Sequence, residues 1–231
     1  MPKVSGSKSS VEEAYRAIKR LMLQQKLFPG QKLLYRELTQ RLGMSKTPIV
    51  NALNRLEQEG FVISEPNVGY AVKPIDAKEI FDSYEVREAL EIKALEKALV
   101  SATDEQMANL EEKYRTLDEY RPHRYDRKKL MLDCEFHLQI AIMSGNEVLR
   151  YLLRRNFEHI ILRTRLDNYD PDRMHVSARE HRDLLKTIKA RDVLKGTELL
   201  GQHIRNARDY VLLCLSTEDQ ESQDAISLFE A

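Results

Sequence analysis

The hydrophobic and polar positions of the chain change their periodicity near residue 74. Before this point, short helical patterns alternate with turn residues. Tyr35–Leu42 is predicted to be a short helix that ends at Gly43, and Lys46–Glu59 is predicted to be the helix that follows. After this point, apolar residues recur at helical spacing with few interruptions. The pattern therefore predicts a mixed N-terminal segment followed by a long, all-helical one.

The N-terminal segment has the features of a winged helix-turn-helix. Ser45 is placed to cap the second helix, and the first turn of that helix tolerates Pro48. After Gly60, the β-prone segments Phe61–Ser64 and Tyr70–Lys73 flank a predicted turn. Two short helices around a glycine turn, followed by a β-hairpin, make up this motif. Its second helix lies in the major groove of DNA.

The C-terminal segment is predicted to be an antiparallel bundle of six or seven helices, so the fold class is mainly α. Thr103 and Gln106 have the spacing of an N-terminal capping box. The predicted helices are Ala77–Ser101, Asp104–Tyr120, Arg127–Ser144, Glu147–Leu166, Met174–Ala190 and Asp192–Ser216. The predicted organisation is a disordered arm at 1–10, a winged helix-turn-helix DNA-binding domain at 11–74, a helical domain at 75–216, and a polar, frayed tail at 217–231.

The formal net charge of zero hides an asymmetry between these two segments. Residues 1–74 contain 12 Lys and Arg against 6 Asp and Glu, whereas residues 75–231 contain 25 against 31. A basic head attracts phosphate, and an acidic body does not. Cys134 and Cys214 lie far apart in helical patterns, which is typical of buried cysteines in a reducing compartment. Without a membrane span or signal-peptide core, the sequence predicts a soluble, cytoplasmic protein that does not act at a membrane.

Four polar residues interrupt the apolar stripes of the predicted bundle. Asp133 and His137 are four residues apart and share one helix face, while His181 and His203 lie on the apolar stripes of two other helices. Each could be a core residue that a neighbour satisfies by hydrogen bonding. Alternatively, one divalent cation such as Zn, Ni or Mn would join all four, since bundle cores hold metals between facing helices.

Arg87 is a further polar residue on an apolar stripe. It could form an ion pair with Glu91, which lies four residues later. It could also present its guanidinium to the same cavity as the four metal-ligand candidates, ready to bind a carboxylate. The remaining histidines, His123, His159 and His175, give weaker signals of a site.

Several motifs in both segments resemble one family. PGQKL, YRELTQRLGMSKTPIVNALNRLEQEGFV and PNVGYAV look like the DNA-binding domain of GntR-family bacterial transcription regulators. YEVREALE, DCEFH, EH and QHI, which begin at residues 84, 133, 180 and 202, look like the FadR-type ligand-binding domain called FCD. Together these similarities span about residues 11–214.

The resemblance implies a homodimer that binds a pseudo-palindromic operator in double-stranded DNA and responds to small carboxylate effectors. It makes Asp133, His137, His181 and His203 the ligands of one divalent metal ion per chain, as in the metal-containing branch of the domain. The effector's carboxylate would approach both the metal and Arg87. The DNA contacts implied by the resemblance come from Arg36, Ser45, Lys46, Thr47 and Gly69.

The sequence departs from the family pattern in the predicted recognition helix and in the wing. Val50 and Asn51 replace the usual Arg-Glu, and Val68 replaces a basic wing residue. We expect these changes to weaken phosphate binding or to shift base recognition to Asn51, whose amide can pair with adenine.

Two other functions are compatible with the predicted metal ligands. The metal could be purely structural, locking the bundle without sensing an effector. A metalloenzyme is the second alternative, but no separate general base, nucleophile motif or phosphate-binding glycine loop accompanies the ligands. The sequence therefore predicts an acid-responsive transcription regulator and not an enzyme.

Overall fold

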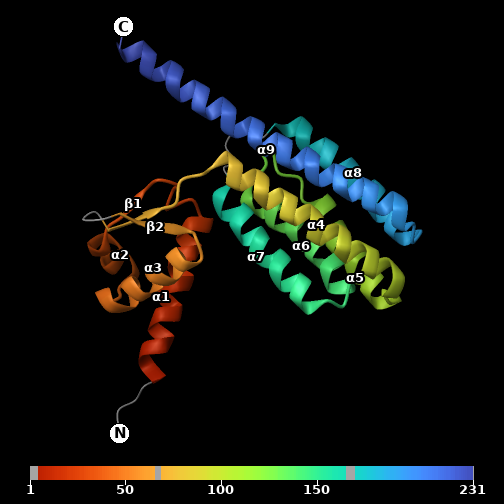
Figure 1. Cartoon of the computed structure of the whole chain (residues 1–231), viewed down its shortest axis with the longest axis horizontal. Helices are drawn as coiled ribbons and strands as arrows, with labels where there is room; N and C mark the ends of the chain where they lie inside the picture. The colour runs from red at the N-terminus through yellow and green to blue at the C-terminus, as the bar shows by residue number, and fades with distance from the viewer. Residues whose placement is uncertain (1–4, 66–68, 165–169, 231) are drawn as a thin grey trace. The chain divides into compact units, whose positions relative to one another are not determined.

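The structure, a computed structural model, describes residues 5–65, 69–164 and 170–230. It divides into two compact units, Met1–Ile75 and Asp76–Ala231 (Figure 1). The first unit combines helices with a small sheet, and the second is helical throughout the part that is described. The mainly helical fold class predicted from the sequence is confirmed.

The N-terminal unit is a winged helix-turn-helix. Its antiparallel sheet has the strand order β1-β3-β2, and Val62 pairs with Val72 while Glu65 pairs with Gly69. The elements are α1 (Ser5–Leu23), β1 (Lys32–Leu33), α2 (Tyr35–Leu42), α3 (Lys46–Gln58), β2 (Val62–Glu65) and β3 (Gly69–Val72). Helices α1 and α3 pack on each other around buried side chains that include Ile18, Ile49 and Leu53.

Glycine sets the turn between the two helices of the motif. Gly43 has a φ of 63°, and its backbone N–H donates to the carbonyl of Thr39, so that α2 ends in a left-handed cap. Ser45 occupies the predicted N-cap position of α3 with an extended backbone, although its side chain makes no capping hydrogen bond. The predicted turn of the wing at 66–68 lies outside the described residues.

The C-terminal unit is a bundle of long helices. Its elements are α4 (Ala77–Ser101), α5 (Asp104–Glu119), α6 (Arg127–Met143), α7 (Glu147–Arg163), α8 (Pro171–Lys189) and α9 (Val193–Glu230). Helix α4 packs against α6, α7 and α9, and α9 in turn packs against α8 (Figure 1). The predicted capping box starts α5, because the Thr103 side chain accepts from the Gln106 N–H while Gln106 accepts from the Thr103 N–H.

Several boundaries differ from the predicted ones. Helix α1 begins at Ser5, within the stretch predicted to be a disordered arm. Helix α9 continues to Glu230 instead of giving way to a frayed tail at residue 217, because no glycine or proline follows Gly201. Helix α8 begins at Pro171, three residues before the predicted Met174, since the Asp170 side chain caps it and proline is tolerated in a first turn.

Candidate metal centre and nucleic-acid interface

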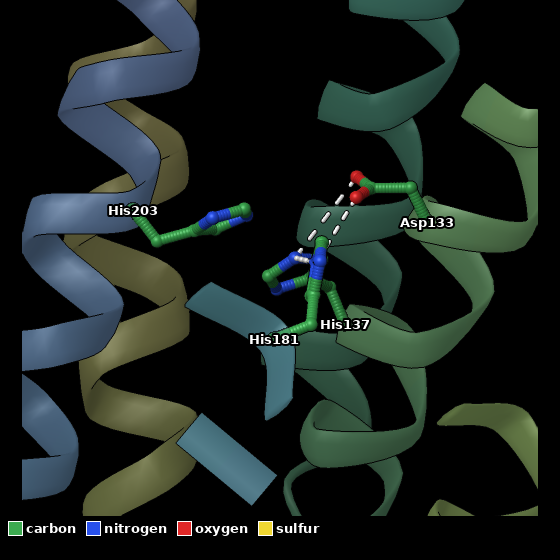
Figure 2. A group of neighbouring side chains, drawn as sticks. All are labelled: Asp133, His137, His181 and His203. Carbon is green, nitrogen blue, oxygen red and sulfur yellow. Dashed lines mark hydrogen bonds and ion pairs between the residues drawn. The ribbon is translucent and has the colours of Figure 1, made fainter. Parts of the chain in front are cut away.

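The four ligand candidates of the helical unit lie together inside the bundle. Asp133 and His137 project from α6, His181 from α8 and His203 from α9 (Figure 2). One potential ligand atom from each residue lies within 4.8 Å of the others, and all four residues are buried. Residues separated by up to 70 positions in the sequence therefore meet at one point.

The ligand atoms are too close together for four independent core residues. The Nε2 atoms of His137 and His181 are 3.2 Å apart. His181 Nε2 lies 3.0 Å from one carboxylate oxygen of Asp133, and His137 Nε2 lies 4.0 Å from the other. Figure 2 shows the imidazole of His203 reaching into the same space from the opposite helix.

A second set of contacts fixes the orientation of all three imidazoles. His137 Nδ1 lies 2.5 Å from Glu91 Oε2, and His203 Nδ1 lies 2.7 Å from Glu180 Oε2. His181 Nδ1 lies 2.8 Å from the backbone carbonyl of Ser177. Carboxylate and carbonyl oxygens accept hydrogen bonds, so these partners favour a proton on each Nδ1 and a lone pair on each Nε2.

With the protons placed on Nδ1, the inward-facing imidazole nitrogens cannot donate hydrogen bonds within the cluster. Two imidazole lone pairs face each other across 3.2 Å, and neither can donate to the other. The Nε2 of His203 is buried without a hydrogen-bond partner among the described residues. Such groups are costly to bury unless something positive joins them. A divalent cation fits this donor set, because ligating histidines usually donate their other N–H to a carboxylate or carbonyl.

Arg87 lies beside this cluster and pairs with Glu91. Its Nε donates to Glu91 Oε1 at 2.6 Å, which confirms the predicted ion pair. One of its terminal nitrogens lies 3.9 Å from Asp133 Oδ2 and has no hydrogen-bond partner in the described part of the chain. The residue is only 3% exposed, so this nitrogen is a buried donor next to the candidate metal centre.

The pKa shifts of His203 and Asp133, two of the four candidate ligands, favour the forms that bind a metal ion. Burial raises the pKa of the Glu91 carboxyl, but His137 and Arg87 outweigh that effect and lower its pKa to about 2. Burial and the neighbouring His181 lower the pKa of His203 to about 3. Against the effect of burial, the proximity of His181, His137 and Arg87 holds the pKa of Asp133 well below its usual value. Charged carboxylates and neutral imidazoles are the forms that bind metal ions.

The orienting residues are the part of the site that the sequence analysis does not assign. Glu91 is expected only as the partner of Arg87, and Glu180 only as a neighbour of His181. The spacing gives a partial signal, because Glu91 shares a helix face with Arg87. Among the described residues, the cluster contains neither His123, His159 nor His175.

The candidate DNA contacts lie mainly on the helix-turn-helix surface. The exposed candidates are Arg36 on α2, Ser45 at the start of α3, and Lys46, Thr47 and Asn51 on α3. The Lys46 ammonium lies 5.0 Å from the centre of the Tyr35 ring, a distance that suits a cation–π contact. In the wing, Gly69 has a φ of 110°, which glycine adopts without strain. Val68 lies outside the described residues.

Comparisons with known proteins support both parts of this description. Residues 10–72 match "Bacterial regulatory proteins, gntR family", and residues 82–206 match the FCD domain. The chain therefore belongs to the GntR family of bacterial regulators and carries an FCD domain. It is a DNA-binding transcription regulator and not an enzyme.

Similar proteins include two curated regulators. The Nta operon transcriptional regulator of Aminobacter aminovorans is 36% identical over 132 residues, 57% of this chain and 62% of that protein. The chain thus matches less than two thirds of this relative's length. The transcriptional repressor GlaR of Escherichia coli is 24% identical over 202 residues, 83% of this chain and 91% of that protein.

Solved structures share the fold. E. coli McbR/YncC superposes with a TM-score of 0.75 at 20% identity, covering 89% of this chain and 98% of that one. A regulator from Rhodococcus has a TM-score of 0.70 at 18% identity, covering 88% of this chain and 98% of that one. In the described residues, no helix is both long and apolar enough to cross a membrane.

Proposed function

We propose that a small organic acid controls the operator affinity of this regulator by binding beside one divalent metal ion in the helical unit. The observation that carries the proposal is the shared orientation of the three imidazoles. Each Nδ1 has an oxygen partner outside the cluster, and the inward His203 Nε2 has none among the described residues. A metal ion bound there would supply coordination positions for a carboxylate oxygen. The donor set suits Zn, Ni and Mn alike.

The surrounding residues have separate roles in this proposal. Asp133, His137, His181 and His203 would hold the ion, while Glu91 and Glu180 orient two of the imidazoles. The free terminal nitrogen of Arg87 would donate to the effector's carboxylate. Because Arg87 also holds Glu91, effector binding would act on α4 as well as on the ligand helices.

DNA recognition is assigned to α2, α3 and the wing. Arg36 and Lys46 would contact phosphates or guanine edges, and Ser45 and Thr47 would contact phosphates. The backbone of Gly69 would approach the minor groove. Asn51 is exposed where the family usually has a charged residue, so its amide is free to read an adenine.

A homodimer is part of the same proposal. Four large apolar side chains on the bundle surface are about half exposed or more: Val86 on α4 and Val148, Tyr151 and Leu152 on α7. Val148, Tyr151 and Leu152 have the spacing of one face of α7, and an exposed apolar helix face is typical of a protein–protein interface. Two-fold symmetry would place the two recognition helices about one DNA turn, roughly 34 Å, apart.

Calorimetry of acid binding tests the coupling between metal and effector. Metal-loaded protein, chelated protein and the His181→Ala variant would be titrated with acetate and longer carboxylates. We expect binding only to the metal-loaded protein, and a shift of about 5- to 150-fold in operator affinity when the acid is present. Acid binding that persists after metal removal would contradict the proposal. Bound metal with no acid binding at all would instead support a structural metal, the alternative left open by the sequence.

A further inference from the structure

A cavity of about 390 Å³ opens in the helical unit between the end of α5, the α5–α6 connection and α8. This volume suits a small ligand. Its lining is strongly basic, with Lys129, Arg121, Arg179 and Arg182, together with two histidines. The acidic unit of the protein thus contains a concave surface that attracts anions.

Among the described residues that line this basic pocket, acidic side chains are too few to neutralise the basic ones. Asp118 is the only acidic residue of its described lining, and its carboxylate lies 3.3 Å from a terminal nitrogen of Arg121. Arg179 has no hydrogen-bond or ion-pair partner among the residues for which the structure gives contacts. The neighbouring Tyr114 hydroxyl raises the pKa of the exposed Arg182 guanidinium, which therefore stays charged. The guanidiniums on α8 therefore remain available to an anionic group.

A second, narrow cavity adjoins the basic pocket and reaches the candidate metal centre. Its lining includes Asp133 and His181, two of the four candidate ligands. The two cavities share the side chains of Asp118, Lys129, Met174 and Ala178. The narrow one holds about 10 Å³, roughly one water molecule, so only a slim group fits without movement. Met174 is a flexible side chain that can widen this passage.

We propose that the basic pocket binds a second anionic group of the effector, while the first anionic group binds at the metal centre. The effector class is then an elongated acid with two anionic ends, the outer one a carboxylate or a phosphate. This inference rests on the proposed function. Arg179 and Arg182 lie three residues apart on α8, so a bidentate contact from either one is available to the outer group.

The test compares acids that differ only in their outer end. The metal-loaded full-length protein would be titrated by calorimetry with butanoate and hexanoate, then with succinate, adipate and 3-phosphonopropionate. We expect at least one doubly anionic acid to bind about tenfold more tightly than the monoacid of equal length, because a charge-assisted hydrogen bond is of that strength. Succinate and phosphonopropionate distinguish a carboxylate from a phosphate-like outer group.

A pair of double variants tests whether the tighter binding of doubly anionic acids depends on the basic pocket. The double variant Arg179→Gln/Arg182→Gln should lose the advantage of the doubly anionic acid, yet keep its metal content and its affinity for the monoacid. The control Arg115→Gln/Lys186→Gln removes two exposed cationic side chains that do not line the cavity, and it should retain the advantage.

Three outcomes would overturn the inference. The first is equal affinity for singly and doubly anionic acids at every length. The second is tighter binding of the doubly anionic acid that persists in Arg179→Gln/Arg182→Gln. The third is that no acid in the series binds. Failure of the proposed function gives a different result, namely acid binding that is unchanged by chelation or by His181→Ala. Monoacid binding that needs the metal but shows no second-anion advantage would reject only the further inference.

Discussion

The two units of this regulator place their candidate functional residues in opposite environments. In the DNA-binding unit, Arg36, Lys46 and Asn51 are exposed, and the buried side chains of the described residues are apolar or aromatic. In the helical unit, Asp133 and the three histidines lie in the core itself. Surface residues can change without altering the fold, whereas buried polar residues are tied to stability. Recognition of DNA and sensing should therefore respond differently to substitution.

The largest expected difference between the units follows from metal removal. If the metal is bound only by the folded bundle, a free concentration about 1,000 times its dissociation constant contributes about 4 kcal/mol of stability. Chelation should remove that stabilisation from α4–α9 and leave the DNA-binding unit little changed. Hydrogen exchange, resolved by segment, measures this. Equal loss of protection in both units would contradict the expected difference between them. As a control, adding the metal back should restore the protection of α4–α9.

A smaller effect is expected from Glu91→Gln. Glu91 orients His137 and pairs with Arg87, so its neutral amide should lower metal affinity by about 10- to 100-fold. Competition with a chelator of known affinity measures this. Glu88→Gln is the matched control on α4, because Glu88 pairs with Arg205 away from the cluster. Equal metal affinity in both variants would exclude the orienting role.

Substitution of Asn51 tests base recognition by α3. Asn51→Ala should relax base preference at one position in each half-site and reduce discrimination there by about 1–3 kcal/mol. Gln58→Ala is a control at the exposed end of the same helix. A binding-site selection that returns the same preferred sequence for Asn51→Ala would rule out this contact. Metal content should not change in either variant.

The smallest expected effect concerns a single phosphate contact. Lys46→Gln should weaken binding to all DNA sequences alike and reduce the salt slope of the affinity by about 1. Fluorescence anisotropy at several salt concentrations measures it. Arg55→Gln is the control, because Glu12 and Glu59 already hold that guanidinium in ion pairs. A sequence-dependent loss for Lys46→Gln would indicate a base contact instead.

How much of the fold could be predicted from the sequence depends on whether an element has a local sequence signal. Local signals define the helix ends well: Gly43 ends α2, and the capping box at Thr103 begins α5. The first helix is missed although Val11, Ala14, Tyr15 and Ile18 recur at helical spacing. Strand β1 has only two residues, too few for a periodic pattern, and exists because it pairs with β3.

The candidate site is predictable only in part because its contacts are tertiary. Polar residues on apolar stripes identify Asp133, His137, His181 and His203 before any fold is known. Which oxygen each Nδ1 meets depends on how α4, α6, α8 and α9 pack. The basic pocket could not be predicted from the sequence either, because only the fold places the surface residues Arg121 and Arg179 around one cavity.

Elemental analysis of untagged protein, purified without a metal column, is the most direct test of the central claim that the core cluster binds a metal. The wild type would be compared with His181→Ala, and with His175→Ala as a control outside the cluster. The account predicts one divalent metal per chain in the wild type and in His175→Ala, and its loss in His181→Ala. Absence of metal from all three, after incubation with Zn, Ni and Mn, would contradict the account.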